Sequence, residues 1–191
     1  MSMTLAGKSI AILAANGFDE KHMTEIQRAF TRAKLSYKVV APEQGLVNGW
    51  QDSAWGHYFP VDMPIGTAMG SDFDLLVLVG GERGIAKLKS NPHTRRIVNH
   101  FLEAGKPIAA IGAGVALLAL SPKAAGREVA ALSEIQDELK AAAMQVREES
   151  QICDANLLSA TGADVAAWAE AALTMAMEIE DAEETEHSVA A

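Results

Sequence analysis

Side chains able to exchange protons stand close together near the start of the chain. Asp19, Glu20 and His22 follow an apolar run over residues 8–15, which ends at Asn16. At neutral pH, His22 could serve as a general base or share a metal ion with a carboxylate. Histidines beside acids at the start of a helix are more often solvated, so the catalytic and the structural interpretation both stay open.

A second candidate site is the turn inside residues 107–120, which read PIAAIGAGVALLAL. Two apolar runs separated by small residues predict a buried parallel strand, a sharp turn and a helix. Open α/β folds place nucleophiles at such turns, because the strand's carboxyl end opens into a crevice toward which helix amides point. Gly112 and Ala113 occupy the turn, and neither has a reactive side-chain atom. We therefore predict a nucleophile position that lacks its nucleophile.

The small residues Gly112, Ala113 and Gly114 leave two further roles open. Backbone amides at the start of the following helix could bind a phosphate or a carboxylate. Close packing of the backbone is the more common role for such residues. A dinucleotide-binding fingerprint would need a third glycine where Leu117 stands, and Gly-x-Ser-x-Gly occurs nowhere in the chain. We expect neither a cofactor nor a serine hydrolase.

Cysteine chemistry is limited to one residue, Cys153. A single cysteine excludes an internal disulfide and a multi-thiolate metal site, and it is typical of a reducing cytosol. Cys153 lies at the start of a late predicted strand, remote from the crevice. Free cysteines commonly pack as small apolar side chains, so we predict a buried or edge structural cysteine and no metal site.

Nearly continuous apolar runs predict strands that are buried on both faces. They cover residues 8–15, 37–41, 74–79 and 107–111, each followed by Asn, Pro or Gly. The helix between the first two runs has an apolar face, formed by Met23, Ile26, Phe30 and Ala33. This β-α-β opening predicts a right-handed parallel crossover.

The second half of the chain continues the alternation of helices and strands. Asn91 and Pro92 predict the cap and first turn of a helix that Gly105 ends. Residues 128–132 and 151–159 resemble shorter strands on either side of a helix over 133–144. A last helix has an apolar face of Val165, Trp168, Ala172, Met175 and Ile179.

Residues 43–71 form a long irregular segment, with five glycines, two prolines and two tryptophans. A connection of this length predicts hairpins or an excursion with a role of its own. Its aromatic residues favour either a cover over the sheet edge or an interface between subunits. They are Trp50, Trp55, Tyr58 and Phe59.

Length and composition indicate a single globular domain over residues 1–180, followed by an acidic tail over 181–191 that we expect to be disordered. The formal net charge of −9 argues against nucleic acid or an anionic membrane surface as a partner. We see no signal peptide and no apolar run of the roughly 20 residues that span a bilayer. We therefore expect a cytoplasmic protein.

The order of these parts resembles the ThiJ/PfpI superfamily, which has the class I glutamine-amidotransferase-like fold. The resemblance covers roughly residues 8–179 and rests on four segments in order. These are ILAANGFDE (12–20), GWQDSAWGHYFPVD (49–62), LLVLVGG (75–81) and AGKPIAAI (104–111). The second segment is similar to the PfpI-type bacterial branch in particular. The resemblance implies a doubly wound, mostly parallel sheet with helices on both faces.

The resemblance also implies which residues would stand in the active site. Gly80 and Gly81 match the pair that helps to form an oxyanion site in the family. Gly112 stands where active members have the cysteine nucleophile, and Ala113 where PfpI-type members have histidine. His22 stands at the position of the acid that contacts the sulfur, with Asp19 and Glu20 as neighbouring acids.

These residues predict a family member without cysteine-dependent catalysis, acting as a stress-linked, scaffold or small-ligand-binding protein. The alternative is a hydrolase or lyase on small carbonyl substrates, with peptidase-, glyoxalase- or deglycase-like activity and His22 or Glu20 as base. The resemblance favours self-association through the aromatic cluster, so we expect a homodimer or a larger homo-oligomer.

Overall fold

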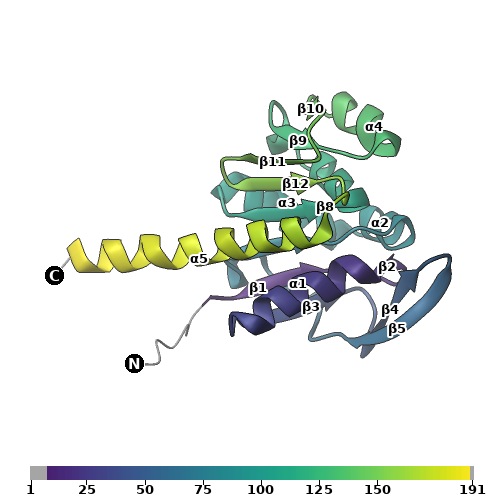
Figure 1. Ribbon diagram of the computed structural model, residues 1–191, viewed down its shortest axis with the longest axis horizontal. Coiled ribbons are helices and arrows are strands. Elements are labelled where there is room, and N and C mark those ends of the chain that lie inside the picture. The colour runs from purple at the N-terminus through teal and green to yellow at the C-terminus, as the bar shows by residue number, and fades with distance from the viewer. Residues whose placement is uncertain (1–7, 190–191) are drawn as a thin grey trace.

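A seven-stranded, mostly parallel sheet forms the centre of the molecule (Figure 1). The computed structural model describes the backbone of residues 8–189 and the side chains of residues 8–178. The strand order is β11-β12-β8-β7-β1-β3-β6, and only β11 runs antiparallel to its neighbour. Their bounds are β1 Ile10–Leu13, β3 Tyr37–Ala41, β6 Met63–Pro64, β7 Leu75–Leu78, β8 Ile108–Ile111, β11 Gln151–Asp154 and β12 Leu157–Ala160. The predicted fold class is confirmed.

Helices cover both faces of the sheet (Figure 1). On one face lie α1 (Glu20–Arg32) and α5 (Val165–Val189), and on the other α2 (Glu82–Lys89), α3 (Pro92–Ala104) and the 3₁₀ helix η2 (Gly112–Leu120). Every residue of β1, β7, β8 and β12 is buried, as strands between two helical layers must be. The apolar side chains therefore form two cores, one on each face.

The predicted helix caps are present. The Asn91 side chain accepts the N–H of His93 at the start of α3, and Gly105 ends that helix in the left-handed conformation, with φ 66°. Asp19 caps α1 by accepting the N–H groups of Lys21 and His22. Because Asp19 is the last residue of β2 (Phe18–Asp19) and its N–H donates to the Gly80 carbonyl just after β7, this cap places the start of α1 at the carboxyl end of the central strands.

The irregular segment forms a hairpin, as predicted. Strands β4 (Leu46–Gln51) and β5 (Ala54–Pro60) pair antiparallel, and β2 pairs with β4 to complete a small three-stranded sheet. In Figure 1 this hairpin projects from the body beside the start of α1.

Several elements differ from the sequence-based predictions. Residues 112–120 form a 3₁₀ helix, in a stretch where glycines weaken the α-helix. The predicted strand over 151–159 is the hairpin of β11 and β12, which turns at Ala155 with φ 50°. Helix α2 was not predicted, because its buried face is only Gly84, Ile85 and Leu88. The backbone of α5 is helical to Val189, and the expected disorder of residues 181–191 stays a prediction.

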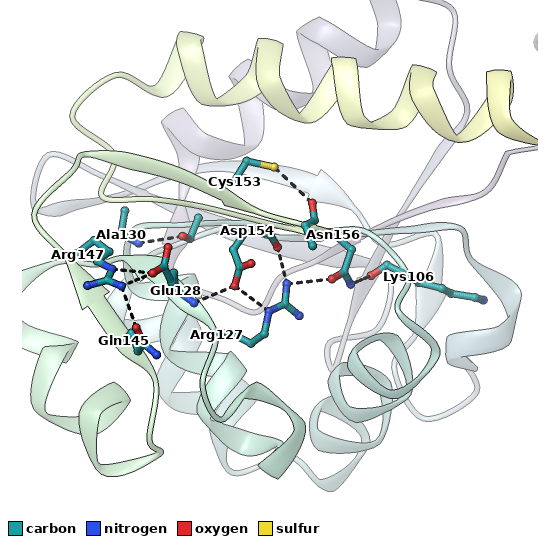
Figure 2. Close-up of polar contacts among 11 residues, drawn as sticks. Lys106, Arg127, Glu128, Ala130, Gln145, Arg147, Cys153, Asp154 and Asn156 are labelled. Carbon is teal, nitrogen blue, oxygen red and sulfur yellow. Dashed lines mark hydrogen bonds and ion pairs between the residues drawn. The ribbon is translucent and has the colours of Figure 1, made fainter.

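A polar network joins the β11 edge of the sheet to a short pair of strands (Figure 2). These strands are β9 (Glu128–Ala130) and β10 (Gln145–Arg147), and α4 (Gln136–Ala141) lies between them in the chain. Arg127 Nε and the Glu128 N–H both donate to Asp154 Oδ2, each at 2.9 Å. Both hydrogen bonds lower the pKa of Asp154, and the one from the Glu128 backbone has the larger effect. Asn156 extends the network by accepting from Arg127 and donating to the Lys106 carbonyl.

Candidate functional site

The turn after β8 has the backbone shape of an elbow, in a conformation that glycine adopts without strain. Gly112 directly follows Ile111, the last residue of β8. Its φ of +58° lies in the left-handed region, where an L side chain is strained. The backbone of Gly114 packs directly against the Leu78 carbonyl, so η2 lies close to the sheet. A turn of this shape holds whatever residue stands at position 112 at the carboxyl end of the central strands.

The imidazole of His22 fills the corner beside this turn. A Cβ placed on Gly112 would lie 2.9 Å from His22 Cε1, and one on Gly80 would lie 2.8 Å from Nδ1. A Cβ on Gly162 would lie 3.3 Å from Nε2. Three glycines thus surround the ring, and His22 occupies space that side chains at these positions would need.

The hydrogen bonding of His22 fixes its tautomer. The Gly80 N–H donates to Nδ1 at 3.1 Å, so the neutral ring carries its proton on Nε2. Burial lowers the pKa of His22, the Asp19 carboxylate offsets part of this effect, and the nearby Lys21 charge adds to it. His22 is therefore neutral at physiological pH, and its one basic lone pair already accepts a hydrogen bond.

We expect the buried imidazole to make the fold less stable in acid. Because the pKa of His22 is lower in the folded chain than the ordinary value of about 6.5, the unfolded chain binds the extra proton more readily. The contribution of the neutral His22 ring to folding stability is complete above about pH 6.5, and it is lost as the pH falls through the folded-state pKa. Urea unfolding of the wild type and of His22→Gln measures it. The variant should show a shallower fall in stability below that pH, and equal slopes would contradict the prediction.

A pocket of about 570 Å³ opens beside the elbow. Asp19, His22, Gly81, Gly112 and Ala113 line it, so the structure brings these predicted site residues together. The rest of the lining comes from three later regions of the chain: Glu82 and Lys89; Leu132, Glu134, Ile135 and Glu138; Thr161 and Gly162. Sequence reasoning missed these later residues, because no motif marks them.

Glu20 lies apart from this pocket, although it is the neighbour of Asp19. Its carboxylate is buried under the hairpin, where Oε2 accepts the His57 N–H at 2.8 Å and Oε1 lies 2.5 Å from His57 Nδ1. Gly49 and Gly56 leave room for it, since a Cβ on either residue would collide with Oε2. Glu20 therefore fastens the hairpin to the start of α1.

The two glycines after β7 have different roles. The Gly80 N–H donates to His22, so this amide is already engaged. Gly81 has φ +106°, begins α2 as its N-cap residue and lines the pocket. Of the predicted pair, only Gly81 faces the space that a ligand would occupy.

Cys153 is remote from the elbow. It lies on β11, two strands from β8, and its exposed side chain lines a separate cavity of about 540 Å³ between β11 and α5. Partial burial raises the pKa of the thiol, and the charges of Glu178 and Asp154 raise it further. A thiol with a raised pKa is a poor nucleophile at neutral pH. Of the two places predicted for a structural cysteine, buried or at an edge, Cys153 has the second, since β11 is an edge strand of the sheet.

Of the four aromatic residues of the hairpin, two pack against other side chains and two are exposed. Phe59 packs edge-on against Phe18, and Arg83 lies 4.1 Å above the Trp50 ring. Trp55 and Tyr58 remain 53% and 67% exposed, which leaves them available for an interface. Self-association through these two side chains stays a prediction.

The described residues, 8–189, contain neither a membrane-spanning helix nor a cluster of metal ligands. No helix in this part of the chain is long and apolar enough to cross a membrane. Within the same residues, no three His, Cys, Asp or Glu side chains are grouped as metal ligands.

Comparison with known proteins places this geometry in a family. General stress protein 18 of Bacillus subtilis is 29% identical over 160 residues, covering 83% of this chain and 91% of that protein. A deglycase of Thermococcus kodakarensis is 26% identical, with 83% and 93% covered. A two-domain protein of Anabaena variabilis, with DJ-1/ThiJ/PfpI-like and ferritin-like domains, has a similar fold. Its TM-score is 0.81 at 23% identity, over 88% of this chain and 48% of that one.

The family model described as "DJ-1/PfpI family" matches residues 8–175. This range contains every element from β1 to the first half of α5, including the elbow and the His22 corner. The resemblance seen in the sequence is thus confirmed. The chain belongs to the DJ-1/PfpI family.

Proposed function

We propose that this protein binds a small ligand in the pocket beside Gly112 and performs no cysteine-dependent catalysis. The observation that carries the proposal is the position of His22, whose ring fills the corner at an elbow that has no thiol. Covalent attack needs an electron pair on the residue at the elbow, and glycine offers none. The pocket remains open next to this corner, with room for a small molecule.

The alternative, an enzyme that uses His22 or Glu20 as a general base, has less support. A base must present a free lone pair to the substrate, whereas His22 Nδ1 accepts the Gly80 N–H. Glu20 is held by His57 under the hairpin and does not line the pocket. Both candidate bases are therefore engaged in structural hydrogen bonds.

We also propose a link to stress, an oligomeric state and a location for the protein. The relative named general stress protein 18 supports a link to stress. The exposed Trp55 and Tyr58 support self-association as a homo-oligomer, which sedimentation of the purified protein would reveal. The single cysteine supports a cytoplasmic location, which is also part of what we propose.

A turnover assay tests the absence of catalysis. We expect the purified protein to convert neither methylglyoxal nor peptide substrates above background, with the Thermococcus kodakarensis deglycase assayed in parallel as a reference. Alkylation of Cys153 and the substitution His22→Ala should leave this background unchanged. Turnover that survives alkylation and falls in His22→Ala would instead establish the enzyme alternative.

A further inference from the structure

A hydrogen-bond donor and an acceptor face the pocket side by side. His22 Nε2, which carries the ring proton, lies 3.7 Å from Asp19 Oδ2, beyond hydrogen-bond distance. Within the described part of the chain, Nε2–H has no acceptor in range, although the His22 side chain is only 9% exposed. Both residues line the pocket, so a ligand bound there would lie beside this pair.

Both members of this pair are held in place. Asp19 Oδ1 accepts the N–H of Lys21 at 3.0 Å and that of His22 at 3.2 Å, which leaves Oδ2 facing the His22 ring. The ring itself is fixed at Nδ1 by the Gly80 N–H. The pair is thus preorganised, and a ligand would not have to order it on binding.

The surroundings of the pair disfavour an anion. Glu82, Glu134 and Glu138 also line the pocket, and the single cation among its lining residues, Lys89, donates to Glu138 at 2.6 Å. Apolar atoms of Leu132 and Ile135 form other parts of the wall. A carboxylate or phosphate would be repelled by the excess negative charge, whereas a neutral polar group would not.

We propose that the pocket recognises a primary carboxamide group, with its carbonyl oxygen on His22 Nε2–H and its N–H on Asp19 Oδ2. From C=O and C–N lengths of about 1.23 and 1.33 Å, the oxygen and nitrogen of a carboxamide lie roughly 2.2 Å apart. Two nearly parallel hydrogen bonds of ordinary length therefore reach a donor and an acceptor that are 3.7 Å apart. A carboxylate has two acceptors and no donor, so it matches only half of the pair.

This inference rests on the proposed function, since it names the ligand class of the same pocket. Its test compares propionamide with the isosteric propionate at about pH 7.5, above the ordinary pKa of histidine. Binding is measured from the ¹⁵N and ¹H shifts of the His22 ring. We expect wild-type protein to prefer propionamide by about tenfold, which corresponds to about 1.4 kcal/mol.

Two variants separate hydrogen bonding from charge. Asp19→Asn keeps a good cap for α1 but can present an NH₂ donor in place of Oδ2, so the preference should reverse toward propionate. Glu134→Gln removes one negative charge from the same pocket without changing the pair, and it should keep the preference for propionamide. Equal responses of the two variants would show that charge alone sets the selectivity, and would overturn the inference.

The remaining outcomes are also distinct. A wild-type preference for propionate, or the absence of binding by either probe, would overturn the carboxamide site and leave the missing cysteine chemistry untouched. Release of ammonia from propionamide would instead contradict the proposed function, because it would show that the pocket hydrolyses what it binds.

Discussion

Gly112→Cys is expected to give a destabilised protein whose new thiol reacts slowly. Residue 112 has φ +58°, and a Cβ there would lie 2.9 Å from His22 Cε1. The His22 ring would have to move away, and this would break the hydrogen bond that it accepts from the Gly80 N–H. Backbone strain of this kind costs roughly 1–3 kcal/mol. Adding Ala113→His, which supplies the histidine of PfpI-type members, leaves this collision in place. A cysteine at position 112 therefore fits only after the His22 ring has been removed.

The double variant Gly112→Cys with His22→Ala supplies that room. We expect its thiol to be alkylated at least about tenfold faster than in Gly112→Cys alone, a difference of about 1.4 kcal/mol or more in activation free energy. The measurement is the rate of iodoacetamide labelling in a Cys153→Ser background, which removes the native thiol. His22→Glu in the same background tests the effect of an acid on the pKa of the new thiol, ordinarily about 8.5. An ionised carboxylate would raise this pKa, as Glu178 and Asp154 do at Cys153, whereas a protonated carboxyl that donates a hydrogen bond to the sulfur would lower it. Equal labelling of the single and double variants would show that His22 does not block the corner.

Gly56→Ala is expected to cost about 2–4 kcal/mol of folding stability. The added methyl group would occupy the position of Glu20 Oε2, so the carboxylate would lose the His57 N–H while still buried. Hydrogen bonds to a charged group are worth more than neutral ones, and an unpaired buried charge costs still more. The hairpin should detach from α1 before the central sheet unfolds.

Gly66→Ala is the matched control for this substitution. Gly66 lies in the same excursion, but a Cβ there would meet its nearest neighbour, His93 Nε2, at 3.7 Å. We expect a change within about 0.5 kcal/mol. Urea unfolding followed by tryptophan fluorescence measures both variants, since Trp50 and Trp55 lie on the hairpin. Equal midpoints for the two variants would mean that the Glu20 contact contributes nothing to stability.

Local sequence was sufficient for much of the fold. The runs that became β1, β3, β7 and β8 are apolar because both of their faces are buried, and this composition is readable without a structure. The caps of α3, Asn91 and Gly105, were likewise predictable, because a cap depends on neighbours a few residues away. Helix α2 escaped prediction because its short buried face gives too little periodicity.

The lining of the pocket was only partly predictable. Position 112 stood out because the strand and turn around it form a local pattern, and the acids after β1 follow from topology. Thr161, Gly162 and the residues around Ile135 reach the pocket through the packing of β12, α4 and their loops. No local pattern encodes such contacts, since they depend on how distant elements dock.

The sequence by itself determined the doubly wound fold and the elbow without a thiol, since these follow from apolar runs and from the identity of residue 112. Only the tertiary structure decided the roles of Glu20 and His22, which are two positions apart and face different neighbours. Glu20 meets His57, 37 residues away, and His22 meets Gly80, 58 residues away. A side chain's burial and hydrogen-bond partner depend on the backbone that folds against it, and here that backbone comes from distant parts of the chain.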